Sequence, residues 1–553
     1  MNTFPNPVER LLQRAEQSPH AAYLHQPIND VWRSYSWSEV ADQSRRMAAA
    51  LIALGLPKGS RIAISGMNTA HWFMADFACG IAGLVGVGLY PKQAASAVHF
   101  IVEHSEAKAV FLGPMPDVEG FLKALPEGPI KIAFPYPSVP ADVCEHRWNA
   151  LIQAHEPLET AVSRGDDELW SLIYTSGTTG NPKGVMVTAK NLKFTTQGLL
   201  RDMPARPEGE HLFSYLPLAH AFERGAVELA SLYLGAEVSF LEELEKLPAT
   251  IKRVRPTRFY AVPLVWARFQ SAILKQVPQE KLDRLMKIPV VSWLIKRKLS
   301  KGMGFDRCWL RISGAASLPL PTLKWFQKLG LEIYQGYGMT ENSIYCSCNL
   351  PGANRLGSVG KPFVDSQVKL ADGNEILNRH DAITPGYYKD PGKTAELFTS
   401  DGWLKTGDVG RLDDDGYLYI TGRVKEIFKT AKGEYVAPAP IEDAFGINTD
   451  IEQLCFVGNG LAQPIMVVAL NEDARKKPRA DVERGLKATM DDVNAKLEPH
   501  ERVAKVVVVK EAWTIDNGMV TPTMKVKRNA VEERYTDLLQ KEIQQRNAVA
   551  WED

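Results

Sequence analysis

A regular alternation of strand-like and helix-like segments near the N-terminus is the feature that most limits how this chain can fold. Short apolar runs of strand length alternate with segments of helical length, in the order 61–65, 71–83, 85–90, 96–107 and 108–113. Apolar residues in the last helical segment, SAVHFIVEHSEA, recur at helical spacing. This order predicts a parallel sheet with helices packed on its faces.

Further strand candidates follow at 211–217, 236–241, 257–263, 308–314 and 331–338. Several end in glycine or proline, as loops between strands and helices do. In open α/β sheets, ligands bind at the loops that follow the carboxyl ends of the strands.

The pattern changes after about residue 420. IEQLCFVG, IMVVALN and AKVVVVKEAW resemble strands, and segments 481–497 and 530–545 resemble helices. At 553 residues the chain is too long for one core. We therefore predict an α/β protein with two domains. Residues 1–422 would form a large domain of stacked, largely parallel sheets with flanking helices, and residues 423–553 a small, mobile α+β domain.

Composition excludes several classes of protein. Lys+Arg and Asp+Glu both number 65, so no net field attracts nucleic acid or an anionic membrane. The N-terminal residues lack a signal-peptide pattern, and the apolar stretch 81–91 is too short to span a bilayer. The six cysteines are scattered, and the pair Cys346 and Cys348 has no second pair to complete a metal site. A cytoplasmic enzyme is the expectation.

Residues 174–184, YTSGTTGNPKG, combine three glycines, four Ser or Thr hydroxyls and Lys183. Glycine lets backbone N–H groups approach an anion, and hydroxyls and an ammonium complement phosphate oxygens. The spacing matches neither the ATPase P-loop nor the dinucleotide fingerprint G-x-G-x-x-G. The segment therefore predicts a phosphate-binding loop of another kind.

The loop closely resembles the phosphate loop of the adenylate-forming superfamily, which includes acyl-CoA synthetases, luciferases and peptide-synthetase adenylation domains. Further segments resemble that family's motifs in the same order: YQGYGMTE (334–341), WLKTGDVG (403–410), YITGRVKEIFK (419–429) and TPTMKVKR (521–528). SYLPLAHAFERG (214–225) and IFKTAKGEYVAP (427–438) resemble the long-chain fatty-acyl-CoA synthetases within it. NEILNRHDAITPGYY (374–388) departs from the family's usual glycine-rich pattern.

The resemblance assigns nucleotide contacts residue by residue. The β- and γ-phosphates of ATP would be held by Thr175, Ser176, Gly177, Thr178, Thr179, Gly180 and Lys183. Adenine would stack on Tyr337, which belongs to the adenine-binding segment Gln335, Gly336, Tyr337, Gly338 and Met339. The other face of the adenine would lie against Gly314, Ala315 and Ala316. Asp408 would accept hydrogen bonds from the ribose hydroxyls, and Arg423 would face the ribose or phosphate.

The same resemblance assigns the chemistry. Glu341 would bind Mg²⁺, with Thr175 as a second ligand, and Thr340 would bond the α-phosphate. Lys525 would reach the α-phosphate as charge develops, while Lys527 and Arg528 are expected to be solvated. His220 is either a core residue or a neighbour of the carboxylate and acyl chain. It is not expected to act as a general base, because a carboxylate nucleophile needs no deprotonation.

In this family the small domain rotates between two half-reactions. Lys425 occupies the hinge position, and Lys429 and Gly433 would then lie beside the route of coenzyme A. The implied activity is an ATP-dependent fatty acid:CoA ligase with ATP, Mg²⁺ and coenzyme A, acting as a monomer or homodimer. Peripheral membrane contact stays open. Three alternative functions also stay open: an acyl-AMP ligase, an aryl-CoA ligase, and a non-catalytic nucleotide- or lipid-binding relative.

Overall fold

The alternating N-terminal segment forms the predicted parallel sheet. The computed structural model describes residues 4–175, 181–521, 524–545 and 547–552. In chain order the segment becomes β3 (Arg61–Ser65), α3 (Ala70–Ile81), β4 (Val85–Leu89), α4 (Ala95–Ser105) and β5 (Ala109–Leu112). All residues of α3 are buried, as expected for a helix without a polar face.

This sheet has seven strands in the order β7-β6-β5-β3-β4-β8-β9. Its outer members are β6 (Ile130–Ala133), β7 (His146–Arg147), β8 (Leu169–Thr175) and β9 (Lys183–Thr188). β8 and β9 pair antiparallel with Thr175 opposite Lys183. The predicted phosphate-binding loop therefore starts and ends at one end of this strand pair.

The later strand candidates build two further sheets. β10 (His211–Ser214) and β11 (Glu237–Phe240) join β1 (Ala22–Ile28) and β2 (Val31–Ser36). β12 (Arg258–Ala261), β13 (Leu310–Ser313) and β14 (Tyr334–Tyr337) are parallel and continue into β15 (Ser347–Cys348) and β16 (Lys361–Pro362). The prediction of stacked, largely parallel sheets is confirmed.

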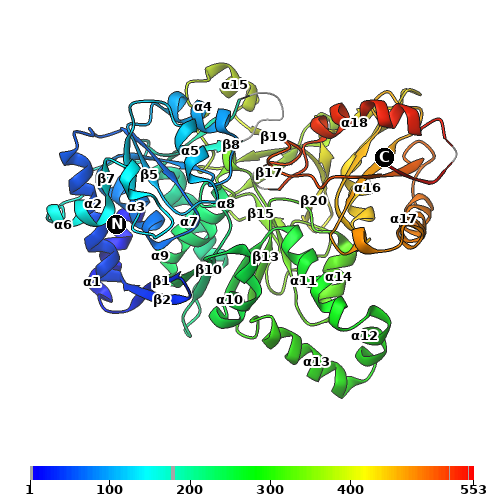
Figure 1. The fold of residues 1–553 in the computed structure, drawn as a ribbon, viewed down its shortest axis with the longest axis horizontal. Helices are drawn as coiled ribbons and strands as arrows, with labels where there is room; N and C mark the ends of the chain where they lie inside the picture. The colour runs from blue at the N-terminus through cyan, green and yellow to red at the C-terminus, as the bar shows by residue number, and fades with distance from the viewer. Residues whose placement is uncertain (1–3, 176–180, 522–523, 546, 553) are drawn as a thin grey trace.

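Helices flank these sheets (Figure 1). They are α1 (Pro7–Gln17), α2 (Trp37–Ala53), α5 (Val118–Ala124), α6 (Trp148–Ala154), α7 (Ala189–Asp202), α8 (Ala221–Glu223), α9 (Ala230–Leu234), α10 (Leu247–Val254), α11 (Pro263–Gln276), α12 (Gln279–Met286), α13 (Pro289–Gly302), α14 (Leu320–Lys328) and α15 (Pro391–Leu397). Among the described residues, no helix has both the length and the apolar character needed to cross a bilayer.

An antiparallel sheet leads toward the C-terminal part of the chain. It contains β17 (Gln367–Leu370), β18 (Glu375–Arg379), β19 (Leu404–Leu412) and β20 (Leu418–Arg423). A turn at Asp413–Gly416 joins β19 to β20, where the Asp413 carboxylate accepts hydrogen bonds from the backbone N–H groups of Asp415 and Tyr417. The divergent segment 374–388 contains β18.

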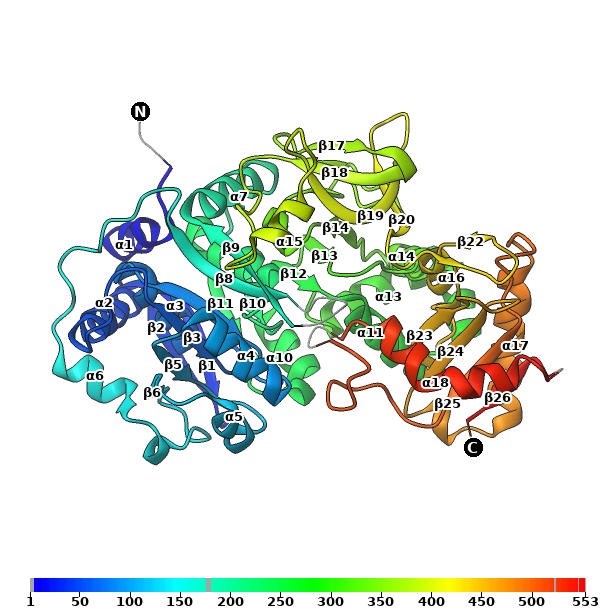
Figure 2. The ribbon, with the colours of Figure 1, turned by 90° about the horizontal axis from the view of Figure 1, so that it is seen from above.

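The C-terminal residues form the expected α+β unit, at the opposite end of the molecule from the N-terminus (Figure 2). It begins with the short strand pair β21 (Phe428–Lys429) and β22 (Tyr435–Val436). A four-stranded sheet follows, made of β23 (Ile451–Val457), β24 (Ile465–Leu470), β25 (Lys505–Val509) and β26 (Val549–Trp551). Three helices cover this sheet: α16 (Pro438–Phe445), α17 (Arg479–Asn494) and α18 (Arg528–Glu542). The exact boundary at residues 422 and 423 stays a prediction.

Between the described residues of this unit and those of the rest of the protein there are three ion pairs. Lys92 Nζ lies 3.0 Å from Asp516 Oδ2, and Lys275 Nζ lies 2.5 Å from Asp473 Oδ2. Arg268 Nη2 lies 3.5 Å from Glu452 Oε1. All three involve exposed side chains, and such pairs typically contribute about 0–1 kcal/mol. Charged contacts of this strength are compatible with a unit that moves.

Candidate active site

Three strands bring together the side chains of Tyr337 on β14, Asp408 on β19 and Arg423 on β20. The Tyr337 hydroxyl, at the end of β14, donates a 2.7 Å hydrogen bond to Asp408 Oδ2. Asp408 on β19 pairs in register with Arg423 on β20, and Arg423 Nε lies 3.0 Å from Asp408 Oδ1. Asp408 is buried. Its charge raises the pKa of Arg423, and burial together with that charge raises the pKa of Tyr337. The carboxylate is therefore oriented by a partner on each of its two oxygens.

Glu341 lies just beyond this group. It belongs to the short helix Thr340–Asn342 that follows β14, and its Oε1 accepts a 2.7 Å hydrogen bond from the hydroxyl of Tyr387. Burial raises the pKa of Glu341, whereas the Tyr387 hydrogen bond and the charge of Lys183 oppose that rise. Lys183 Nζ lies 5.0 Å from the centre of the Tyr387 ring. An oriented, buried carboxylate is a donor that a hard cation prefers.

The tight path of the chain before Glu341 depends on Gly338. A Cβ atom there would lie 2.5 Å from the backbone carbon of Ile344, so a larger residue would displace the turn. The Met339 N–H donates to Asn342 Oδ1 at 2.8 Å and fixes the same turn. At Gly336, by contrast, an added Cβ would make only ordinary contacts of 3.4 Å or more.

Lys525 approaches from the small C-terminal unit. Burial lowers its pKa to about 8, and Arg423 acts in the same direction, whereas Asp408, Glu426 and Glu341 oppose the change. These electrostatic neighbours place the ammonium among the residues described above. The Lys525 N–H donates to Thr521 Oγ1 at 3.1 Å. Lys525 is therefore near the site although its own secondary-structure context is a loop.

His220 is also close to Lys525. Its pKa is lowered to about 4 by burial and by the charge of Lys525, so the imidazole is neutral near pH 7. His220 Nδ1 accepts a 3.1 Å hydrogen bond from the N–H of Phe222 at the start of α8. The two roles left open by the sequence, a satisfied structural residue and a neighbour of the reacting groups, are thus compatible.

Other predicted nucleotide-binding residues have structural roles of their own. The Gln335 amide accepts from the Leu318 N–H at 2.9 Å and donates to the Ser358 carbonyl at 3.1 Å. Ala315 has φ +68°, which lies in the left-handed region, and a Cβ at Gly314 would lie 3.2 Å from the Phe222 ring. Five residues of the predicted phosphate loop lie outside the described residues: Ser176, Gly177, Thr178, Thr179 and Gly180.

The residues predicted to form the hinge and to line the coenzyme A route are on the surface. Lys425 is exposed in the turn that follows β20. Lys429 Nζ on β21 lies 5.3 Å from the centre of the Tyr435 ring, and Gly433, with φ +88°, occupies the turn between β21 and β22. All three residues are exposed in this arrangement of the chain.

One expectation from the lysine motif is wrong. Arg528 is not solvated: Nη2 lies 2.7 Å from Glu442 Oε1 and 3.7 Å from Glu426 Oε2, and Nη1 donates to the Phe456 carbonyl. The guanidinium is drawn inward because two carboxylates and a carbonyl satisfy it at the start of α18. Lys527 is exposed, as expected.

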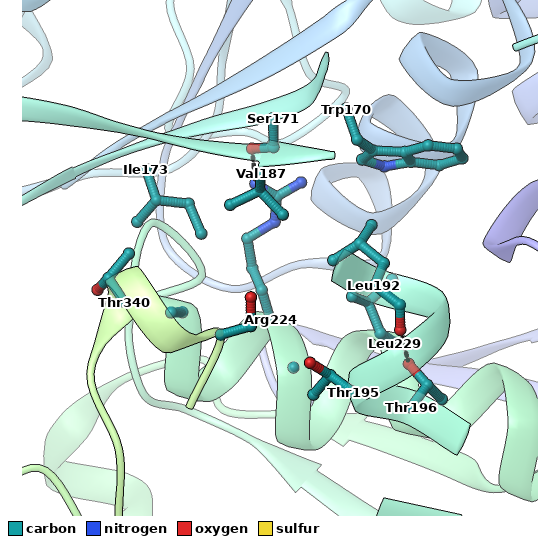
Figure 3. A pocket seen from close by; sticks show the side chains of 13 residues that line it. Trp170, Ser171, Ile173, Val187, Leu192, Thr195, Thr196, Arg224, Leu229 and Thr340 are labelled. Atoms are coloured by element: carbon teal, nitrogen blue, oxygen red, sulfur yellow. Dashed lines mark hydrogen bonds between the residues drawn. The ribbon is translucent and has the colours of Figure 1, made fainter. Parts of the chain in front are cut away.

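An apolar pocket lies beside the charged group formed by Glu341, Asp408, Arg423, Lys183 and Lys525. Figure 3 shows the side chains that line this pocket. Its empty volume, with open solvent included, is about 500 Å³. The lining residues are Trp170, Ser171, Ile173, Val187, Leu192, Thr195, Thr196, Ala221, Arg224, Gly225, Leu229, Thr340 and Ser343. Thr340 precedes Glu341 in the chain and therefore connects the pocket to the charged group.

Arg224, which lines this pocket, belongs to a buried ion-pair group that the sequence motifs do not indicate. Arg224 Nη2 lies 2.5 Å from Asp76 Oδ1, and Nε lies 3.5 Å from Glu228 Oε2. Arg224 also donates to the Ser171 hydroxyl (Figure 3). Burial raises the pKa of Glu228 well above its ordinary value, which favours its neutral form. Nothing in the local sequence around Asp76 or Arg224 indicates that they pair.

Tyr387 was missed as well. It follows Pro385 and Gly386 within the divergent segment 374–388, and its contact with Glu341 spans 46 positions. The only signal available was that this segment departs from the family pattern.

Comparison with known proteins identifies the family. The model for "AMP-binding enzyme" matches residues 11–388, and that for "AMP-binding enzyme C-terminal domain" matches residues 425–546. A protein named long-chain-fatty-acid--CoA ligase FadD15 from Mycobacterium bovis is 30% identical, over 96% of each chain. Fatty acyl-CoA synthetase A from Dictyostelium discoideum is 31% identical over 92% of this chain and 85% of its own.

The fold also matches solved structures. The crystal structure of the anthranilate CoA ligase AuaEII in complex with anthranoyl-AMP superimposes with a TM-score of 0.79 and 22% identity, over 98% of this chain and 99% of that one. Since both family models match in order and the first alone covers more than half of the residues, the chain belongs to the AMP-binding enzyme family.

Proposed function

We propose that this protein is an AMP-forming fatty acid:CoA ligase. The observation that carries the proposal is the junction at Thr340. This residue lines the apolar pocket, and the next residue, Glu341, belongs to the charged group with Tyr387 and Lys183. A carboxylic acid whose chain fills the pocket would thus present its carboxylate where a nucleotide phosphate is bound. The names of the 30–31% identical relatives support a fatty acid as the substrate.

In the first half-reaction, the carboxylate oxygen attacks the α-phosphorus of ATP, and pyrophosphate leaves. Asp408 accepts the ribose hydroxyls, Tyr337 lies against adenine, and Lys183 contacts the outer phosphates with the loop at 176–180. Thr340 and Lys525 bind the α-phosphate, where negative charge develops. Catalysis of this kind is mainly positioning and charge stabilisation.

Mg²⁺ would be held by Glu341 with Thr175. The donor set fits, because the buried Glu341 carboxylate is oriented by Tyr387, and oxygen ligands suit this cation. When bound, the ion neutralises phosphate charge.

In the second half-reaction, the thiol of coenzyme A attacks the acyl carbon, and AMP leaves. Lys525 would obstruct that approach in the arrangement described, so the small C-terminal unit has to rotate about Lys425. Rotation would replace the lysine loop with the surface carrying Lys429 and Gly433. The weak ion pairs between the two parts of the molecule favour such a movement.

Chain length should depend on the pocket. Burial of each methylene contributes about 0.8 kcal/mol, so a pocket lined by Trp170, Leu192 and Leu229 rewards longer acids. An aryl-CoA ligase is the second candidate, supported by the fold match to an anthranilate CoA ligase. The relatives that match at higher identity favour the fatty acid.

A screen of pyrophosphate release tests the proposal. Acids from acetate to oleate, with benzoate and anthranilate as aryl probes, are supplied with ATP and Mg²⁺, with and without coenzyme A. We expect rates that rise with chain length, and a thioester product when coenzyme A is present. Preference for the aryl acids, or release without thioester formation, would contradict the assignment.

A further inference from the structure

Helix α13 and the residue before it expose an unusual group of apolar side chains. Ile288, Val290, Trp293 and Leu294 have exposed fractions of 51%, 70%, 57% and 52%. They are four of the fifteen exposed large apolar side chains among the described residues, and they fall within seven positions. Scattered exposed apolar residues need no explanation, but a cluster of this kind marks an interaction site.

The cluster continues as a stripe along the helix. Val290, Trp293 and Leu294 are followed at the same helical spacing by Arg297, Lys298 and Lys301, all exposed. Residues at such spacing share one helix face. The Arg297 guanidinium lies 5.5 Å from the centre of the Trp293 ring, where the apolar and basic halves of the stripe meet.

Charge is concentrated in the same place. Helix α13 contains four basic residues and no acidic one, and segment 279–302 as a whole has seven basic and two acidic residues, a net charge of +5. The full chain has a net charge of zero. This helix pair is therefore a local positive patch, and the rest of the chain carries a net charge of −5.

Two contacts fix α12 to helix α14. Lys328 Nζ on α14 lies 2.5 Å from Asp283 Oδ1 on α12, and the Trp325 indole N–H donates to Gln279 Oε1 at 2.9 Å. No residue of α13 is buried, and α12 and α13 project from the lower edge of the molecule in Figure 1. The outer face of α13 is thus held in place but has no covering element among the described residues.

We propose that this α13 face (Ile288, Val290, Trp293, Leu294, Arg297, Lys298 and Lys301) docks on an anionic lipid bilayer. Apolar residues with a tryptophan enter the interfacial region, and the basic residues contact anionic headgroups. A second copy of the chain fits less well, because a self-complementary contact would bring like charges together. The choice of a lipid surface also rests on the proposed function, whose substrate partitions into bilayers.

Vesicle flotation with the full chain, without added nucleotide, tests the proposal. We expect binding to vesicles of phosphatidylcholine with phosphatidylglycerol, weaker binding to phosphatidylcholine alone, and release by high salt. V290D/W293D should abolish binding by removing the apolar anchor. R297E/K298E should weaken binding to anionic vesicles by about tenfold or more, since each basic residue contributes about 1 kcal/mol. V364D, at an isolated residue that is 78% exposed, is the matched control and should bind normally.

Three outcomes would overturn the docking site. They are no vesicle binding by the unaltered protein, equal binding by V290D/W293D and V364D, and a self-association in sedimentation that the α13 variants abolish without any lipid binding. Circular dichroism and pyrophosphate release with the soluble acid octanoate show whether the variants are folded. If the protein binds vesicles but activates no acid, the proposed function fails while the docking site stands.

Discussion

The hydroxyl of Tyr337 donates a 2.7 Å hydrogen bond to Asp408, which joins the end of a parallel strand to the middle of an antiparallel one. Because Arg423 holds the other carboxylate oxygen at 3.0 Å, Asp408 is fixed in one orientation before any ligand binds. A buried carboxylate arranged in this way is suited to two neighbouring hydroxyl donors such as those of ribose.

Asp408→Asn should therefore weaken ATP binding. A hydrogen bond to a charged group is worth about 1.5–3 kcal/mol, so we expect the KM for ATP to rise about ten- to hundredfold. Tyr337→Phe keeps the ring and removes a single hydrogen bond, and its effect should be smaller. Asp413→Asn is the matched control, because Asp413 lies on the neighbouring turn and pairs with Arg355. Equal effects of the two aspartate variants would contradict the ribose assignment.

Lys525→Ala should lower the rate of acyl-adenylate formation by about 10²–10³, the loss typical of removing one charge-stabilising donor. Lys527→Ala, two residues away on an exposed side chain, should have little effect. Single-turnover pyrophosphate release measures both. Equal losses in the two variants would show that the first lysine of the motif has no special role.

The same lysine predicts a pH dependence. Its pKa is lowered to about 8, so the charged form dominates below that pH and is lost as the pH rises through it. Since kcat/KM reports the free enzyme, kcat/KM for ATP should fall above about pH 8. Lys525→Arg, which keeps its charge throughout, should lack this alkaline limb even if it is slower. An unchanged limb in the arginine variant would assign the titration to another group.

Lys425→Pro should separate the two half-reactions. Proline fixes φ near −65°, so it hinders a hinge that has to change its backbone angles. We expect pyrophosphate release in a single turnover to persist and thioester formation from supplied acyl-adenylate to collapse. Lys425→Ala removes the side chain but leaves the backbone free, and it should retain both steps. Equal loss of both half-reactions in the proline variant would refute the hinge role.

Much of the fold could be predicted because its signals are local. In segment 61–112, the spacing of apolar residues that distinguishes a strand from a helix is contained within each strand or helix. Each predicted strand or helix there forms within a few residues of its expected bounds. The contacts that complete the site are not local. Tyr387 meets Glu341 across 46 positions, and Arg224 meets Asp76 across 148. Arg528 was expected in solvent because nothing near TPTMKVKR indicates that Glu442 lies beside it.

Arg224→Met should destabilise the protein. It removes the cation that compensates the buried Asp76, and breaking one side of a buried pair costs about 3–5 kcal/mol. Arg224→Met combined with Asp76→Asn removes both charges and should recover part of that loss. Urea unfolding, followed by circular dichroism, measures the free energy of unfolding of all variants. If the double variant is no more stable than the single one, Asp76 does not carry the uncompensated charge.

The pocket beside Thr340 makes a prediction about chain length. Thr195 lines this pocket, and its hydroxyl has no hydrogen-bond partner among the described residues. Thr195→Leu should therefore reduce the volume of the pocket without breaking a hydrogen bond between described residues. Each methylene that no longer fits should cost about 0.8 kcal/mol, or about fourfold in kcat/KM, for the longest acids. Leu229→Ala enlarges the pocket and should shift preference toward longer acids. Pyrophosphate release across a series of fatty acids measures both variants, and the KM for ATP should not change. If both variants keep the original chain-length profile, the acyl chain binds elsewhere, because a filled pocket cannot change in volume without changing which chains fit it.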